Sequence, residues 1–303
     1  MAQEEARHRE PLSTRSFELD WACVDHRKKL MKLDTSVSLS TYRASDGAAY
    51  ERFLGRWSRL LADPFVEFAR ASDDGGALDV GCGTGSLALA LSERGGPSRI
   101  AGIDIATPYI AFARSRQKGA AIDFLVGDAC RLPFADRSFA AALAQLSLNF
   151  VPNAEMAVLE MQRVVKPGGV VAATVWDFRG GLVYQRLFWD SAAGLEPEAG
   201  ATRDRLFSGQ LALPDGLRRL WREAGLRAVE RDSLTIRMEY ADFYDYWDPL
   251  LGGQGPVGSY IEKLPLERRR QIEERVRAAF LSGAPDGPRS LTATAWAVRG
   301  VVS

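Results

Sequence analysis

The chain has 303 residues, 46% of them hydrophobic and 26% charged, which is the ordinary composition of a globular protein. Lys and Arg together number 39, and so do Asp and Glu, so the net charge is zero and the basic excess typical of nucleic-acid binders is missing. Nucleic acid is therefore not an expected partner, whereas the low net charge leaves a homodimer open.

The cysteines and histidines give no sign of a metal site or of a disulfide framework. Cys23, Cys82 and Cys130 are far apart, and both histidines, His8 and His26, lie near the N-terminus. No run of about 18 apolar residues occurs, so no transmembrane helix is expected. The first ten residues are rich in charge and lack the apolar core of a signal peptide, so the expected location is the cytoplasm.

The N-terminal part divides into a polar segment and a helical one. Residues 1–45 are of mixed charge and without a clear period, and we interpret them as a tail or a loosely docked cap. From Ala49 to Ala69, apolar residues recur at helical spacing, with an expected break near Asp63-Pro64. This pattern predicts one or two helices ahead of the core.

From residue 77 onward, short apolar runs alternate with helical segments. The predicted strands are 77–80, 100–105, 122–126, 139–146 and 170–176, and the predicted helices between them cover 87–91, 110–114 and 154–161. This alternation predicts a parallel sheet built from βαβ units. The runs are almost entirely apolar, as strands in a sheet covered on both faces must be. The run at 139–146 is rich in alanine, and its place in the alternation favours a strand.

After Asp177 the regular alternation stops. The last part of the alternation is a predicted turn at 166–169, just before the fifth strand. Beyond Asp177, a helix is predicted to end near Leu226, with Gly225 as its C-terminal cap. A strand follows at 228–236, then a helix of mixed charge at 266–280, and residues 291–298 alternate like a final strand.

A glycine-rich turn follows the first strand. Gly81, Gly83 and Gly85 allow the backbone to approach a ligand closely, and the helix after them offers free N–H groups. Such a site suits a nucleotide-type cofactor. The dinucleotide fingerprint GxGxxG would have a third glycine or alanine at position 86, where this chain has Ser86, and no phosphate-binding GxxxxGK[ST] string occurs. Cys82 is interpreted as a small residue that fills the turn.

Two carboxylates follow the next two strands. Asp104 lies 19 residues after Gly85, where a carboxylate can accept hydrogen bonds from both hydroxyls of a ribose. Asp128 ends the third strand and can accept from an adenine amino group, while the N–H of Ala129 can donate to the ring. Asp128 therefore favours a cofactor that contains adenosine but is not NAD.

Together these segments resemble the class I S-adenosylmethionine-dependent methyltransferases, in particular the ubiquinone/menaquinone-biosynthesis C-methyltransferase type. The segments that carry the resemblance are 78–85, 102–104, 127–129, 132–134 and 165–169. The resemblance implies an α/β fold with a Rossmann-like seven-stranded sheet flanked by helices, an N-terminal helical cap and an insertion after the fifth strand. The domain would cover residues 46–303, and S-adenosylmethionine would be the cofactor.

The resemblance also implies roles for single residues. Asp79 would position the methionine ammonium, and Gly81, Gly83 and Thr84 would line the methionine and ribose portion. Asp104, with Ile105 beside it, would bind the ribose, and Asp128 with Ala129 would bind the adenine. Gln145 would lie near the sulfonium. Tyr50 and Arg56 would close over the cofactor.

The acceptor of the methyl group is expected to be a small apolar or aromatic molecule bound by residues 178–265. We expect Trp176, just before this region, and aromatic side chains within it to line the pocket; those within it are Tyr184, Phe188, Trp189, Phe243, Tyr246 and Trp247. No general base is evident. An NAD-dependent oxidoreductase and a non-catalytic cofactor-binding protein are the alternatives, and cofactor binding followed by methyl-transfer assays would separate the three.

Overall fold

The computed structural model describes residues 42, 44–72, 75–97, 99–117, 119 and 121–303. The predicted tail or cap over residues 1–45 lies almost entirely outside the described residues. Within them, the N-terminal helical cap consists of α2 (Gly47–Tyr50), the π-helical turn η1 (Glu51–Gly55) and α3 (Arg56–Ala69). Asp46 caps α2 by accepting hydrogen bonds from the N–H groups of Ala48 and Ala49.

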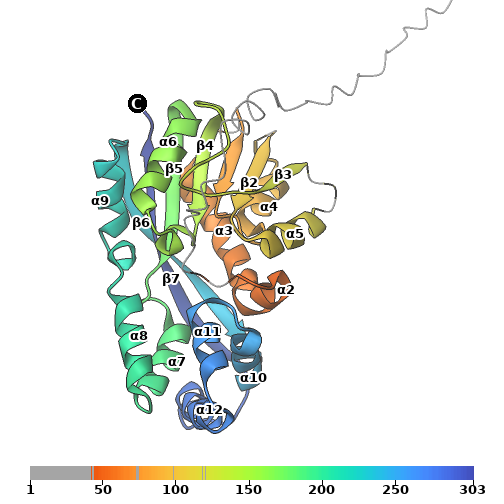
Figure 1. The fold of residues 1–303 in the computed structure, drawn as a ribbon, viewed down its shortest axis with the longest axis vertical. Coiled ribbons are helices and arrows are strands. Elements are labelled where there is room, and N and C mark those ends of the chain that lie inside the picture. The colour runs from red at the N-terminus through yellow and green to blue at the C-terminus, as the bar shows by residue number, and fades with distance from the viewer. Residues whose placement is uncertain (1–41, 43, 73–74, 98, 118, 120) are drawn as a thin grey trace, which may run out of the picture. The chain divides into compact units, whose positions relative to one another are not determined.

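One seven-stranded sheet organises the described chain, with the order β3-β2-β1-β4-β5-β7-β6 (Figure 1). The strands are β1 (Ala77–Val80), β2 (Ile100–Asp104), β3 (Ile122–Val126), β4 (Phe139–Gln145), β5 (Val165–Trp176), β6 (Arg227–Tyr240) and β7 (Arg289–Val301). The first five strands are parallel, whereas β7 runs antiparallel between β5 and β6. The α/β fold with a seven-stranded, helix-flanked sheet is therefore confirmed.

Helices cover both faces of the parallel strands, which explains why these strands are apolar throughout. On one face lie α3, α4 (Ser86–Glu93) and α5 (Thr107–Ser115), and on the other lie α6 (Ala154–Val164) and α9 (Gly216–Glu223). The alanine-rich run is strand β4, buried along its whole length. Small side chains at the centre of the sheet let both helical layers approach closely, which overrides the helix propensity of alanine.

Two details differ from the predicted elements. The expected break at Asp63-Pro64 is wrong, because α3 continues through Pro64. Proline frees only the carbonyl four residues earlier, that of Leu60, which is half-exposed, so water can satisfy it. The expected turn at 166–169 is an irregular beginning of β5, whose pairing with β4 shifts register between Phe139 and Ala141.

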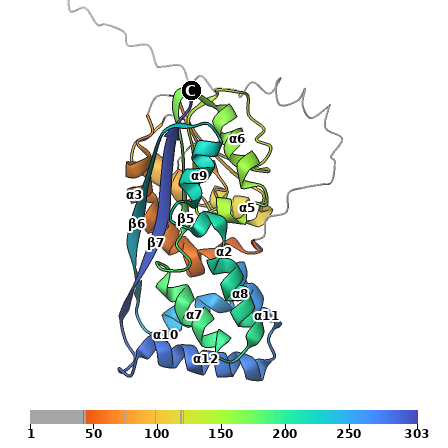
Figure 2. The same ribbon diagram turned by 90° about the vertical axis from the view of Figure 1, so that its left-hand side faces the viewer.

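The single insertion expected after the fifth strand is in fact two. After β5 come α7 (Val183–Ala193), α8 (Pro197–Phe207) and the short η3 (Gln210–Ala212); between β6 and β7 come α10 (Phe243–Trp247), η4 (Asp248–Gly252), α11 (Gly255–Lys263) and α12 (Leu266–Leu281). Figures 1 and 2 show α7, α8, α10, α11 and α12 gathered at the lower end of β6 and β7. Together with η1, α3 and the ends of β5, β6 and β7, they enclose a large aromatic core.

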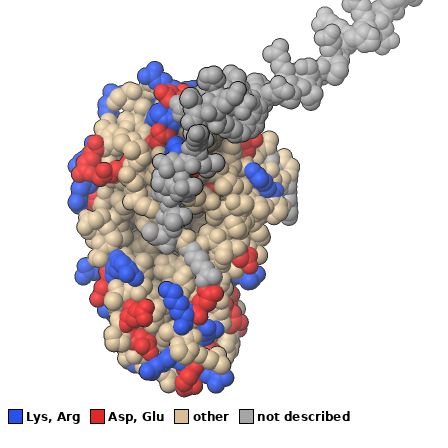
Figure 3. Space-filling view, in the orientation of Figure 1, with Lys and Arg blue, Asp and Glu red and all other residues tan. Residues whose placement is uncertain are grey.

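The outer surface of the described residues carries charges of both signs. On the face in Figure 3, blue and red side chains are interleaved, and outside the grey atoms no broad area carries a single sign. Of the helices in the described part of the chain, none is long and apolar enough to cross a bilayer.

Candidate functional site

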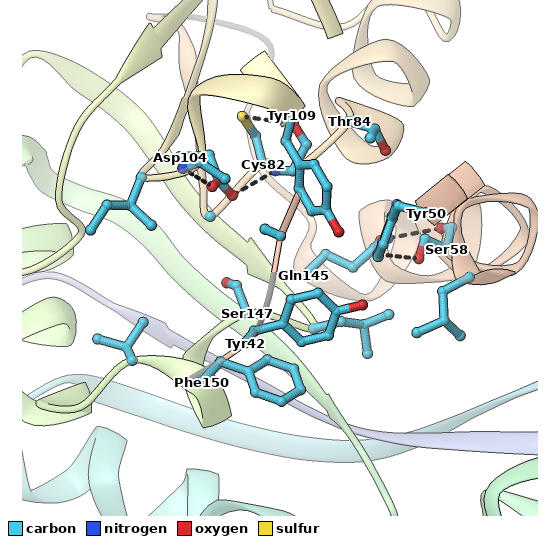
Figure 4. Close-up of a pocket in the computed structure, with 18 of the residues that line it drawn as sticks. Tyr42, Tyr50, Ser58, Cys82, Thr84, Asp104, Tyr109, Gln145, Ser147 and Phe150 are labelled. Carbon is cyan, nitrogen blue, oxygen red and sulfur yellow. Dashed lines mark hydrogen bonds between the residues drawn. The ribbon is translucent and has the colours of Figure 1, made fainter. Parts of the chain in front are cut away.

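A cavity of about 350 Å³ lies at the carboxyl ends of the parallel strands, where the strand order reverses between β1 and β4 (Figure 4). This is the position at which open α/β sheets bind ligands. Ten of the eleven residues proposed from the sequence to bind the cofactor line it: Tyr50, Asp79, Gly81, Gly83, Thr84, Asp104, Ile105, Asp128, Ala129 and Gln145.

The glycine turn forms the floor of the cavity by adopting left-handed backbone. Gly81 and Gly85 have φ angles of +70° and +88°. A Cβ atom on Gly85 would lie 2.7 Å from the ring of Phe124. Both conditions require glycine, so the sequence pattern reflects a tight turn under a ligand-sized space.

Asp79 is buried at the end of β1, with only 1% of its surface exposed. Its Oδ2 accepts a hydrogen bond from the N–H of Ala88 at 3.1 Å, whereas its Oδ1 has no partner among the described residues. Burial raises the pKa of this carboxyl from 3.8 to about 8. An unpaired carboxylate oxygen on a cavity wall is suited to a cationic group of a ligand.

Asp104 is held at the end of β2 by backbone donors. The N–H of Gly83 donates to its Oδ2 at 2.9 Å, and the N–H of Ala106 donates to its Oδ1 at 2.8 Å. Burial raises the pKa of Asp104 and these bonds counteract part of that rise. Each carboxylate oxygen keeps a second lone pair, so both can still accept from a ligand's hydroxyls.

Asp128 and Ala129 are half-buried on the cavity wall after β3. Asp128 Oδ1 accepts from the N–H of Cys130 at 2.8 Å, which fixes the carboxylate in the turn. The arrangement is the ordinary aspartate turn, and it also leaves the carboxylate on the cavity, as the sequence predicts.

Gln145 and Tyr50 enter the cavity from β4 and from the helical cap. The Nε2 of Gln145 donates to the carbonyl of Ser58 at 2.8 Å, while its Oε1 is buried without a partner among the described residues. The hydroxyl of Tyr50 lies 3.2 Å from that of Ser58 (Figure 4). The cap and the sheet therefore meet at this cavity.

Comparison with known proteins agrees with this geometry. Residues 78–173 match a family described as a methyltransferase domain. The chain is 39% identical over 97 residues to the demethylmenaquinone methyltransferase of Staphylococcus aureus strain JH9, a match that covers 31% of this chain and 40% of that protein. Residues 78–173 form a class I methyltransferase domain.

Solved structures share the fold of this methyltransferase domain over a longer range. The YcgJ protein of Bacillus subtilis is 20% identical with a TM-score of 0.53, and the match covers 80% of this chain and 98% of that one. The [4+2]-cyclase SpnF is 22% identical with a TM-score of 0.51, covering 87% of each chain. Because a protein described as a cyclase has this fold, the chemistry of the chain must be argued from its site.

Arg56 is the one proposed cofactor residue that does not line the cavity of the methyltransferase domain. Its guanidinium pairs with Asp245 of α10 at 2.8 Å and lies over the ring of Trp57 at 4.2 Å. This corrects the expectation that Arg56 closes over the cofactor, since a carboxylate and an aromatic face hold the cation elsewhere.

The expected aromatic lining is also wrong in most of its members. Only Trp176 lines the cavity. The other six belong to the aromatic core around α7 and α10: Tyr184, Phe188, Trp189, Phe243, Tyr246 and Trp247. Large rings gain most from full burial against one another, and here they fill the space between the inserted helices. The cavity is instead lined by rings such as Phe53, Phe150 and Phe178.

Sequence reasoning missed a clasp around Gln254, which is 1% exposed. Its Oε1 accepts from the hydroxyl of Tyr109 at 3.0 Å and from the N–H of Ser45 at 3.2 Å. Its Nε2 donates to the hydroxyl of Ser45 at 2.9 Å. The clasp joins the chain before α2, helix α5 and helix α11, and the sequence carries no local signal for contacts between such distant residues.

The phenols and the thiol at the cavity are poor bases. Burial raises the pKa of Tyr50 to about 12 and also raises the pKa values of Tyr42 and Tyr109. Burial likewise raises the pKa of Cys82, with the carboxylates of Asp79 and Asp104 adding to the effect. These groups stay protonated near neutral pH, so they can donate hydrogen bonds but do not abstract protons, and Cys82 is not a nucleophile.

Proposed function

We propose that this protein transfers a methyl group from S-adenosylmethionine to a small apolar or aromatic acceptor. The proposal depends above all on Asp79, whose unpaired buried oxygen meets the cavity where an amino-acid ammonium would lie. A pyrophosphate in the same turn would give this buried carboxyl no cationic partner and would raise its pKa further, which disfavours NAD. The chain matches only 40% of the length of its curated relative, so the activity is inferred from the site.

The residues of the chain would hold the cofactor at three points. Asp79 would pair with its ammonium, Asp104 would accept from the ribose hydroxyls, and Asp128 with Ala129 would bind the adenine edge. When bound, S-adenosylmethionine supplies a methyl group already activated on a sulfonium sulfur. The cavity then has only to align an acceptor with that carbon and exclude water, an effect worth about 7–11 kcal/mol in favourable cases.

Among the described residues, the acceptor end of the first cavity has no titratable base. The carboxylates that line the first cavity are Asp79, Asp104 and Asp128, and all three lie at the cofactor end. The acceptor end is lined by the rings of Phe53, Trp176 and Phe178. We infer that the acceptor brings a nucleophilic atom that is already ionised or carries a free lone pair.

The ribose contact provides the test of cofactor identity. We expect Asp104→Ala to weaken S-adenosylmethionine binding about tenfold or more in isothermal titration calorimetry, because hydrogen bonds to a charged group contribute about 1.5–3 kcal/mol each. Asp123→Ala, at an exposed position on β3, is the matched control and should bind normally. Unchanged affinity in a folded Asp104→Ala protein, or binding of NAD in place of S-adenosylmethionine, would refute the proposal.

A further inference from the structure

A second cavity, of about 700 Å³, adjoins the first. The two share part of their lining: Phe150, Val151, Pro152, Phe178 and Pro256. The lining that the two cavities share is apolar. The second cavity therefore opens beside the carboxyl ends of β4 and β5, next to the part of the first cavity that holds Trp176.

The sizes of the two cavities assign them different occupants. Pockets for drug-sized ligands measure about 300–1,000 Å³. A cofactor made of an adenosine and an amino acid is of that size, so a cavity of about 350 Å³ leaves room beside the cofactor only for the reacting end of an acceptor. An acceptor of any length must then occupy the neighbouring space.

The second cavity is amphipathic, because two helices turn one side toward it. Glu198, Thr202 and Arg205 follow one another at helical spacing along one side of α8, and Ser259, Tyr260 and Lys263 do so along α11. Between the helices the lining is mainly apolar, with Leu148 and Ala212 among the buried residues.

The cations of this cavity differ from their neighbours in lacking a counter-ion. Arg203, on the same helix as Arg205, pairs with Asp190 at 3.2 Å, and Arg268 pairs with Glu196 at 2.8 Å. For Arg205 and Lys263 no ion pair exists among the described residues, and both are exposed. Of the described residues that line the same cavity, Glu198 is the one acidic residue, so together with Arg205 and Lys263 these side chains carry a net positive charge.

We propose that the second cavity binds the acceptor, and that the acceptor is an amphipathic organic anion. Its apolar body lies on the floor between α8 and α11, its acidic group faces Arg205 and Lys263, and its reacting end points past Phe150 and Phe178 toward the first cavity. The role as acceptor site rests on the proposed function, whereas the binding of such an anion does not.

A pair of fluorescent probes tests the charge preference directly. The anion 8-anilinonaphthalene-1-sulfonate and its uncharged analogue N-phenyl-1-naphthylamine share an aromatic body, and both brighten in apolar surroundings. With the first cavity saturated by S-adenosylhomocysteine, we expect one molecule of the anion to bind per chain, at least fivefold more tightly than the neutral probe. Raising the salt concentration should weaken binding of the anion only.

Charge variants locate the site. Arg205→Glu with Lys263→Glu should weaken anion binding about tenfold and leave the neutral probe unaffected, whereas Glu198→Gln should tighten anion binding. Arg222→Glu, at an exposed position of α9 outside both cavities, is the control and should have no effect. Equal affinity for the two probes, or equal losses in the double variant and the control, would overturn the proposal.

The same samples separate this proposal from the proposed function. Failure of S-adenosylhomocysteine to bind contradicts the cofactor assignment, while the two probes can still be compared in the empty protein. Binding of S-adenosylhomocysteine without selective binding of the anion leaves the cofactor site intact and refutes the anionic acceptor. A probe that the cofactor product displaces would lie in the first cavity, which also counts against the second site.

Discussion

At the scale of single residues, the carboxyl of Asp79 is suited to a bound ligand and not to the empty protein. Burial raises its pKa to about 8, because one oxygen accepts only the N–H of Ala88 and the other has no partner among the described residues. The folded protein therefore binds a proton here more tightly than the unfolded chain, whose carboxyl titrates near 3.8. This difference links the stability of the empty protein to pH.

We expect the free energy of unfolding of the empty protein to fall as pH rises from about 4 to 8, by up to about 1.4 kcal/mol per pH unit from this group. The stabilisation is complete below the unfolded pKa and is lost as pH passes the folded one. Asp79→Asn should remove this contribution, so urea titrations at pH 5, 7 and 8.5 should show the variant gaining on the wild type. The variant should also bind S-adenosylmethionine weakly. Parallel pH profiles of the two proteins would contradict the assignment.

A second constraint on a single residue is found at Gly85, where both the backbone conformation and the space around it fit only glycine. We expect Gly85→Ala to reduce the free energy of unfolding by about 2–4 kcal/mol, since the methyl group would both occupy left-handed backbone and press on Phe124. Gly95→Ala is the control, because Gly95 has a φ of +67° but open space around its Cβ position. It should lose only about 1 kcal/mol in the same urea titration. Equal losses would mean that Phe124 simply moves aside.

At the scale of elements, the π-helical turn η1 joins the helical cap to the glycine turn. Glu51 accepts hydrogen bonds from the hydroxyl of Thr84 and from the guanidinium of Arg116, the latter at 2.8 Å. Arg116 also donates to the carbonyl of Thr84 at 3.0 Å. A Cβ atom on Gly55 would collide with the Glu51 carboxylate, so glycine at this position gives the side chain room to fold back. Extra turns of this kind are common at functional sites.

A double-mutant cycle measures this link. We expect a coupling energy of about 1 kcal/mol between Glu51→Gln and Arg116→Gln, because the two side chains are only 21% and 24% exposed. The pair of Arg59 and Glu93, in which the carboxylate is 62% exposed, should show about 0.5 kcal/mol or less when its cycle is measured in the same way. No difference between the two cycles would mean that η1 is not specifically fastened to the turn.

At the scale of the whole molecule, the first cavity joins elements that are far apart in the chain, from Tyr42 to Pro256. Its walls come from the helical cap, from the ends of five strands and from the beginning of α11. A ligand in this position restrains all of these parts at once. Binding only to the folded state then stabilises the whole structure.

We expect S-adenosylhomocysteine at about one hundred times its dissociation constant to add about 2.7 kcal/mol to the free energy of unfolding and to raise the melting temperature by about 5 °C. Differential scanning fluorimetry can measure this shift. NAD at the same concentration should give none, and Asp104→Ala should reduce the shift caused by S-adenosylhomocysteine. A shift with NAD alone would favour the oxidoreductase alternative.

Sequence by itself predicted the parallel strands and most of the residues that meet at the first cavity. A buried strand is a short apolar run, and its end is marked by the glycine or aspartate that follows it, as at Gly81, Asp104 and Asp128. Because parallel strands place their carboxyl ends at one edge of the sheet, residues far apart in the chain must converge there. The structure places each of these residues on the first cavity.

Only the tertiary structure decided which side chains surround the acceptor end. Helical periodicity shows that Tyr184, Phe188 and Trp247 face inward, but it does not distinguish a packed core from a ligand pocket, because both require apolar side chains. The position of the Arg56 side chain is set by its hydrogen bond to Asp245, 189 positions away in the chain. That of Tyr109 is set by its hydrogen bond to Gln254, 145 positions away. Local sequence determined the parallel strands and their ends, whereas long-range packing determined which cavity each side chain reaches.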